Sequence, residues 1–271
     1  MKALNRPYAS YRRDLLSAMT NAEQALYPTA IDRSCDQARR YARKSPHLQT
    51  LTAATWTSNT ARDCFYDLYG ANRNAVGAIH DRVWKSAGVH NRVRCPYCGI
   101  PGRMHALDHY LQRTSFPELS LYVRNLVPCC DPCNSIKRTF SSAGLRQILH
   151  HYDDEIDSLP ELIVVTFTHA SPGRPVAEFS VEPSSNPEHE LFRRHFYALK
   201  LDTAYREQAA SLLQVYRGTA LREKLDAASI VKALLTIAAN LRAEFGPNQY
   251  EASLYEAAAT DTQLLQWMMT S

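Results

Sequence analysis

Two Cys-x-x-Cys pairs constrain this chain more than any other feature. The first pair is Cys95 and Cys98, and the second is Cys130 and Cys133. The tight turn within each pair lets two sulfurs approach one ion, and four thiolates can surround zinc tetrahedrally. Gly99 directly follows the first pair and suits a backbone turn that other residues adopt at a cost. We therefore predict a structural zinc site on these four cysteines.

The cysteine count favours metal over disulfides. The chain has seven cysteines, an odd number, and five of them lie between residues 95 and 133. A disulfide framework normally uses an even count in a secreted chain. Residues 1–20 contain no apolar stretch of a secretory signal, and no run of eighteen apolar residues predicts a membrane span. We expect a cytoplasmic protein without membrane contact. Redox use of the pairs is the weaker alternative, because no βαβ pattern surrounds them.

Charge divides the chain into a basic front and an acidic back. Residues 1–80 carry 11 basic and 6 acidic side chains, and residues 81–146 carry 10 and 4. Residues 147–271 carry 10 basic and 17 acidic side chains. The basic part suits a polyanion such as DNA. The acidic part is better suited to binding protein.

The apolar periodicity predicts a mostly helical α+β protein. We expect helices within 8–45, interrupted at Tyr27-Pro28 and resuming over 31–44, then a loop over 46–60 and helices over 71–87 and 134–150. The run 162–167 and residues 176–181 predict a β-hairpin that turns at 171–173, and about four helices follow from 188. The expected regions are 1–88, 89–150 and 151–271.

A basic run lies on the expected 31–44 helix. Arg39, Arg40, Arg43 and Lys44 fall on roughly one face at helical spacing. Such a face could track phosphates, or it could simply be solvated. The sequence leaves both readings open.

Between the cysteine pairs lie residues with catalytic chemistry. Asp108 and His109 follow an expected strand, Asn125 precedes the second pair, and Asn134 comes directly after Cys133. Taken singly, Asp108-His109 would be a surface pair, Asn125 a turn residue and Asn134 a helix cap. A zinc ion that joins the two pairs would draw Asp108 and His109 toward Asn134, which predicts one compact polar site.

This order of residues resembles the HNH endonuclease motif of the ββα-metal fold. The resemblance covers about 45 of the 271 residues and is closest to the zinc-ribbon branch of that family. Two departures are visible. Asn134 stands where the name-giving form has His, and Gln112 stands where a proline often follows.

The resemblance implies a role for each matching residue. His109 is similar to the general base, and Asp108 and Asn134 to the ligands of a catalytic divalent ion, Mg²⁺ or Mn²⁺. Asn125 is similar to the middle motif residue, which holds the loop and orients His109. Charge and proximity add Arg113, Lys137 and Arg138 as candidate contacts to flanking phosphates.

Two function classes follow. The first is hydrolysis of DNA phosphodiester bonds, which the resemblance favours. Zinc-ribbon HNH proteins of this size are similar to effector nucleases of bacterial antiphage systems, including the nuclease subunits of Septu-type and retron systems. That likeness implies a separate ATPase or other defence subunit as partner. We hypothesise that residues 185–271 dock such a partner or a second copy of the chain. The second class is a non-catalytic zinc-ribbon module that binds nucleic acid or acts as a scaffold.

Overall fold

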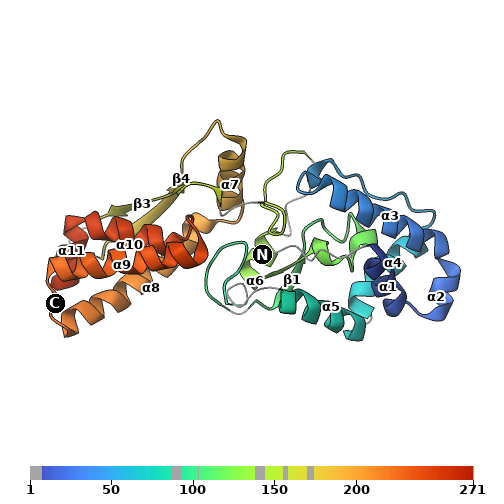
Figure 1. Ribbon diagram of the computed structural model, residues 1–271, viewed down its shortest axis with the longest axis horizontal. Coiled ribbons are helices and arrows are strands. Elements are labelled where there is room, and N and C mark those ends of the chain that lie inside the picture. Colours follow the sequence, from blue (N-terminus) through green and yellow to red (C-terminus); the bar gives the residue numbers. More distant parts are fainter. Residues whose placement is uncertain are drawn as a thin grey trace. The chain divides into compact units, whose positions relative to one another are not determined.

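The computed structural model describes residues 8–71, 73–86, 93–102, 104–137, 144–154, 158–169 and 174–270. The chain divides into two compact units, residues 1–154 and residues 155–271. Helices dominate the described residues, and two antiparallel β-hairpins accompany them (Figure 1). The prediction of a mostly helical protein with small β elements is thus confirmed. No helix in the described ranges is both long enough and apolar enough to cross a membrane.

The first unit begins with five helices. They are α1 (Tyr8–Ala18), α2 (Asn21–Leu26), α3 (Pro28–Lys44), α4 (Asn59–Ala71) and α5 (Arg73–Ser86), and a short 3₁₀ turn, η1 (Leu48–Thr50), follows α3.

The break expected at Tyr27-Pro28 is confirmed. Pro28 occupies the first turn of α3, where its missing N–H costs nothing. The helix therefore starts three residues earlier than expected. Helix α4 was not expected, because polar Asn and Thr residues surround its start.

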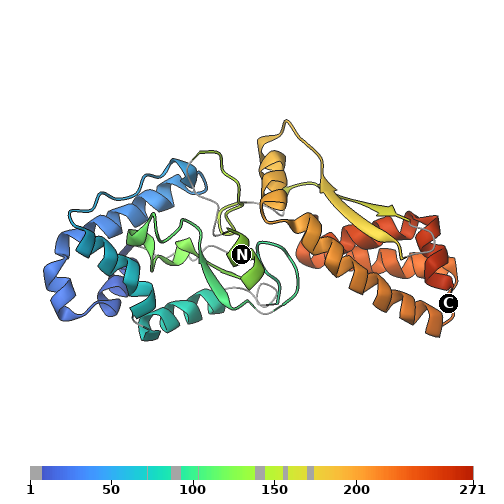
Figure 2. The ribbon, with the colours of Figure 1, turned by 180° about the vertical axis from the view of Figure 1, so that it is seen from behind.

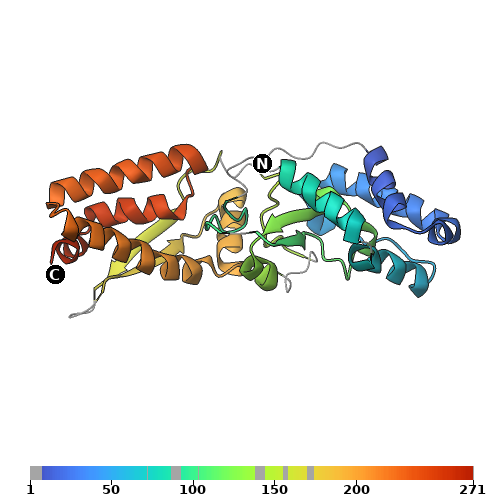
Figure 3. The same cartoon turned by 90° about the horizontal axis from the view of Figure 1, so that it is seen from below.

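A hairpin and a short helix follow. Strand β1 (Ala106–His109) pairs antiparallel with β2 (Leu126–Cys129), so that Asp108 lies opposite Val127 and His109 opposite Leu126. Two 3₁₀ turns, η3 (Pro117–Leu119) and η4 (Val123–Asn125), lie in the connection. Helix α6 (Asp131–Lys137) packs against β1, and α5 lies beside β2 (Figure 3).

One hydrophobic core holds the first unit together. It joins apolar side chains of the N-terminal helices, such as Leu15, Tyr41 and Phe65, to the connection between β1 and β2, which contributes Leu119 and Leu121. Each of these side chains is fully buried. Regions 1–88 and 89–150 therefore share one core.

The helix expected over 134–150 is corrected. Helix α6 spans Asp131–Lys137, whereas the described residues 144–154 are not helical. Gly144 has a φ of +91°, which interrupts a helix. Leu145 is 64% exposed, whereas Ile148 and Leu149 are buried. Phe140 and the other residues of 138–143 lie outside the described residues.

The second unit is a hairpin covered by helices. Strand β3 (Ile163–Thr168) pairs with β4 (Val176–Val181), as expected, and the expected turn at 171–173 lies outside the described residues. Helix α8 packs on β4 and α10 on β3 (Figures 1 and 2). Between residues 174 and 270 there are five helices where about four were expected: α7 (Pro187–Ala198), α8 (Leu201–Arg222), α9 (Ala227–Phe245), α10 (Tyr250–Thr260) and α11 (Thr262–Met269).

Candidate active site

The four predicted cysteines lie together. The sulfurs of Cys95, Cys98, Cys130 and Cys133 are all within 4.8 Å of one another, and 3.9 Å separates those of Cys98 and Cys130. In a tetrahedral zinc–thiolate site, bonds of about 2.3 Å place the sulfurs roughly 3.8 Å apart. These four residues can therefore bind a metal ion such as zinc.

Local backbone geometry builds the first pair. Gly99 has a φ of +69°, and its N–H donates to the carbonyl of Cys95 at 2.7 Å. The Cys95 N–H donates to the carbonyl of Ile100 at 3.1 Å, which closes a tight loop. The Cys130 N–H points at the Cys95 sulfur from 3.4 Å, so the second pair approaches the first through its backbone as well. The second pair spans the junction of β2 and α6.

Hydrogen bonds among the clustered thiols shift their pKa values in opposite directions. A hydrogen bond with Cys133 is the largest cause that lowers the pKa of Cys130, and the same contact raises the pKa of Cys133. This contact therefore favours the thiolate, the form that binds metal, at Cys130 over Cys133. Cys129 stays outside the cluster on β2, where burial raises the pKa of its thiol.

Asp108 is a buried carboxylate on β1. Its Oδ2 accepts a hydrogen bond from the Tyr97 hydroxyl at 2.7 Å and forms an ion pair with the Lys137 ammonium, also at 2.7 Å. Its Oδ1 has no hydrogen bond within the described part of the chain. One oxygen of Asp108 is therefore fixed, and the other is available to a further ligand.

Lys137 lies inside the protein. Its side chain is 2% exposed, and its ammonium also donates to the carbonyls of His109 at 3.1 Å and Tyr110 at 3.0 Å. The structure thus turns this residue toward Asp108 and away from the surface, where a phosphate contact was expected. The three donors of an ammonium are all used.

His109 is half-buried on β1 beside Asp108. Its Nε2 lies 2.9 Å from the carbonyl of Ser120, and its ring packs in a T-shaped arrangement with the Tyr69 ring, with 4.6 Å between ring centres. A carbonyl only accepts, so Nε2 carries the proton and Nδ1 keeps its lone pair. Burial lowers the pKa of His109 from 6.5 to about 4, and the hydrogen bond to Ser120 offsets this in part. The imidazole is therefore neutral at pH 7.

Arg113 lies near this imidazole. Its guanidinium sits over the ring of Tyr66, 4.1 Å from the centre, and 5.4 Å from the centre of the Tyr69 ring. Two tyrosines of α4 therefore hold a cation close enough to His109 to oppose protonation of its ring. No sequence pattern pointed to Tyr69 or Tyr97, because their contacts with His109 and Asp108 depend on the tertiary structure.

Asn125 closes the connection between β1 and β2. It is fully buried, its Oδ1 accepts from the Leu111 N–H at 2.8 Å, and its Nδ2 donates to the Leu111 carbonyl at 3.1 Å. Its own carbonyl accepts from the Tyr110 N–H at 2.8 Å. These bonds fix the backbone directly after His109.

Asn134 lies in α6, which packs against β1. Its side chain is partly exposed and makes no hydrogen bond with the described residues. Lys137 follows it by three positions, so the two share a helix face, and Lys137 reaches Asp108. Arg138, the remaining predicted phosphate contact, lies outside the described residues.

The chain is similar in sequence to a phage protein. The chain is 32% identical over 126 residues to protein ea31 of Escherichia phage lambda, a match that covers 44% of this chain and 42% of that protein. The chain thus spans less than half the length of this relative, whose name states no activity. No family model matches the chain, and no solved structure matches it.

Proposed function

We propose that this chain is a metal-dependent endonuclease of the HNH type that hydrolyses phosphodiester bonds in DNA. One observation carries the proposal: a buried carboxylate and a neutral imidazole, Asp108 and His109, are adjacent on a strand that packs against α6. Tyr97, which lies between two cysteines of the cluster, donates a hydrogen bond to that carboxylate. The strand, strand, helix order of β1, β2 and α6 suits the ββα-metal fold that the motif implies.

His109 is the general base of this proposal. Its Nε2–H is held by Ser120, so the free Nδ1 accepts a proton from the attacking water. The water oxygen bonds to phosphorus as the bond to the departing 3′ oxygen breaks. The packed ring of Tyr69 and the hydrogen bonds of Asn125 keep the imidazole in place during this step.

Asp108 and Asn134 would hold the catalytic ion. The donor set fits Mg²⁺ or Mn²⁺, since these ions prefer oxygen, and the carboxylate Oδ1 and the amide of Asn134 make no hydrogen bond in the described ranges. Bound there, the ion would stabilise negative charge on the phosphate and the leaving oxygen. Lys137 fixes the carboxylate through its other oxygen. Zinc in the cysteine cluster would be structural.

A supercoiled-plasmid cleavage assay tests the proposal. The wild type is compared, with Mg²⁺ or Mn²⁺, with His109→Ala and with His105→Ala, a matched change at an exposed histidine of the same segment. We expect metal-dependent nicking that His105→Ala retains and His109→Ala loses. Equal nicking by both variants would refute the assignment of the base.

The alternative is a zinc-ribbon module that binds nucleic acid or acts as a scaffold without cleaving it. It predicts a folded, zinc-loaded wild type that leaves the plasmid intact under every metal condition. The role in antiphage defence, with a separate ATPase or other subunit bound through the acidic residues 185–271, stays a prediction from resemblance. Repeating the assay with such a partner separates an inactive module from a nuclease that awaits activation.

A further inference from the structure

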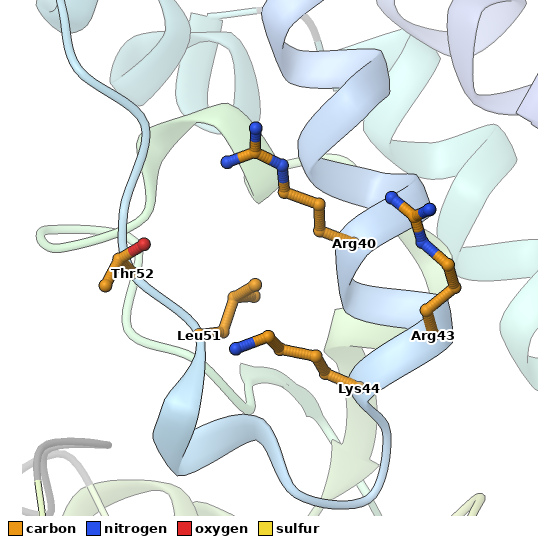
Figure 4. A pocket seen from close by; sticks show the side chains of 5 residues that line it. All are labelled: Arg40, Arg43, Lys44, Leu51 and Thr52. Carbon is orange, nitrogen blue, oxygen red and sulfur yellow. The ribbon is translucent and has the colours of Figure 1, made fainter.

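A basic pocket lies at the C-terminal end of α3, on the first unit. It has a volume of about 410 Å³, within the roughly 300–1,000 Å³ typical of ligand sites. Arg40, Arg43 and Lys44 of α3 form one wall, and Leu51 and Thr52 form the other. Figure 4 shows Arg40 and Lys44 extending from the helix toward the irregular segment that carries Leu51 and Thr52.

Among the described residues, no carboxylate forms an ion pair with the basic side chains that line this pocket. Residues 37–62 contain no Asp or Glu. The two carboxylates of α3 lie earlier in the helix and pair elsewhere, Asp32 with Arg12 and Asp36 with Arg39. Within the described part of the chain, Arg40 and Arg43 have neither an ion pair nor a hydrogen bond. Their guanidinium groups are exposed and ready for an anion.

Hydrogen bonds hold the wall opposite the helix in place. The Gln37 side chain donates to the carbonyl of Thr52 at 2.6 Å, and the Lys44 ammonium donates to the carbonyl of Thr50 at 2.7 Å. Leu51, the apolar residue of this wall, is buried. The hollow is therefore built before any ligand arrives, which lowers the entropy cost of binding.

Helix stabilisation explains only part of this arrangement. Basic side chains in a last turn interact favourably with the helix dipole, which accounts for Arg43 and Lys44. It does not account for Arg40, a turn earlier, or for the fixed wall that faces it. The arrangement fits a ligand that carries several negative charges along its length.

We propose that this pocket binds backbone phosphates of the DNA substrate, away from the cleaved bond; the proposal rests on the nuclease function above. The pocket and the candidate active site belong to the same unit. The Tyr41 hydroxyl of α3 donates to the carbonyl of Arg124 at 3.0 Å, next to the loop-closing Asn125. Arg40 and Arg43 thus stand on a helix that is fastened to the active-site framework.

Fluorescence anisotropy on a labelled DNA duplex tests the proposal. All proteins carry His109→Ala and are measured without added divalent ion, so that no DNA is cut. The pocket variant is Arg40→Gln with Arg43→Gln, and the control with equal charge change is Arg13→Gln with Arg174→Gln, two exposed arginines outside the pocket. Two lost phosphate contacts make the log–log salt slope shallower by roughly 2 and weaken binding roughly fifty-fold at 0.1 M salt.

The outcomes separate this proposal from the nuclease function. Weaker binding and a shallower slope in the pocket variant, but not in the control, support the pocket even if the wild type proves not to cut DNA. Equal affinity of pocket variant and control overturns it, even if plasmid cleavage establishes the nuclease. Calorimetry with inorganic phosphate tests whether the pocket instead binds free phosphate. If the pocket variant loses phosphate binding but keeps its DNA affinity, the assignment of DNA as the ligand is overturned.

Discussion

Glu118 is a carboxyl group buried in the connection between β1 and β2, and its ionisation should make the first unit less stable as pH rises. It is fully buried, its Oε1 accepts from the Ala54 N–H at 2.7 Å, and its Oε2 has no partner among the described residues. Burial raises the pKa of Glu118 from 4.5 to about 7, and the bond to Ala54 offsets this in part. The neutral acid is therefore the form that the folded protein favours.

The sign and size of the effect follow from linkage. A raised pKa means that the folded state binds the proton more tightly, so stability falls as pH rises from the unfolded value toward the folded one. Each unit of pKa corresponds to about 1.36 kcal/mol. For values of 4.5 and about 7, ionisation costs roughly 3 kcal/mol at pH 8 and less than about 1 kcal/mol at pH 5.

Denaturant unfolding at pH 5 and pH 8 measures this cost. Glu118→Gln keeps the acceptor for Ala54 and removes the ionisation, so we expect it to lose roughly 2.5 kcal/mol less than the wild type between the two pH values. Asp81→Asn, at an exposed carboxylate of the same unit, is the control and should follow the wild type. If Glu118→Gln and the wild type lose the same free energy, the burial argument is wrong.

Three further changes test the site itself. Removal of zinc with a strong chelator, or the substitution Cys130→Ser, should unfold the region around the two cysteine pairs. Elemental analysis should find about one zinc per wild-type chain. A metal-free protein with an unchanged fold would contradict this prediction. Asn125→Ala should lower the free energy of unfolding by roughly 2–4 kcal/mol, because it leaves the buried N–H and C=O of Leu111 without partners. The control Asn240→Ala, at an exposed position on α9, should have little effect on the free energy of unfolding. Lys137→Met should lower the free energy of unfolding by roughly 3–5 kcal/mol, because it leaves the buried charge of Asp108 unpaired. Adding Asp108→Asn should restore part of this loss. No recovery in the double variant would show that Lys137 acts by packing.

Local patterns were enough to predict several elements. The break at Tyr27-Pro28 and the hairpin of β3 and β4 depend on residues close together in sequence, where turn chemistry and alternation act directly. The helix expected over 134–150 was wrong over 144–150, because its apolar spacing arose from Ile148 and Leu149, which are buried in an irregular segment. Spacing of apolar residues reports burial, and burial does not require a helix.

What the sequence determined by itself about the site was its chemistry. Each cysteine pair needs only a turn of four residues, and Asp108 and His109 are neighbours in the chain, so their types and spacing predict a metal cluster and an adjacent acid and imidazole. Tertiary structure decided which groups surround them. It placed Lys137 on Asp108, Ser120 and Tyr69 on His109, and the opposite wall on the basic face of α3. Most of these contacts join different secondary-structure elements, and they arise where a shared core forces polar groups to find partners, which no local pattern records.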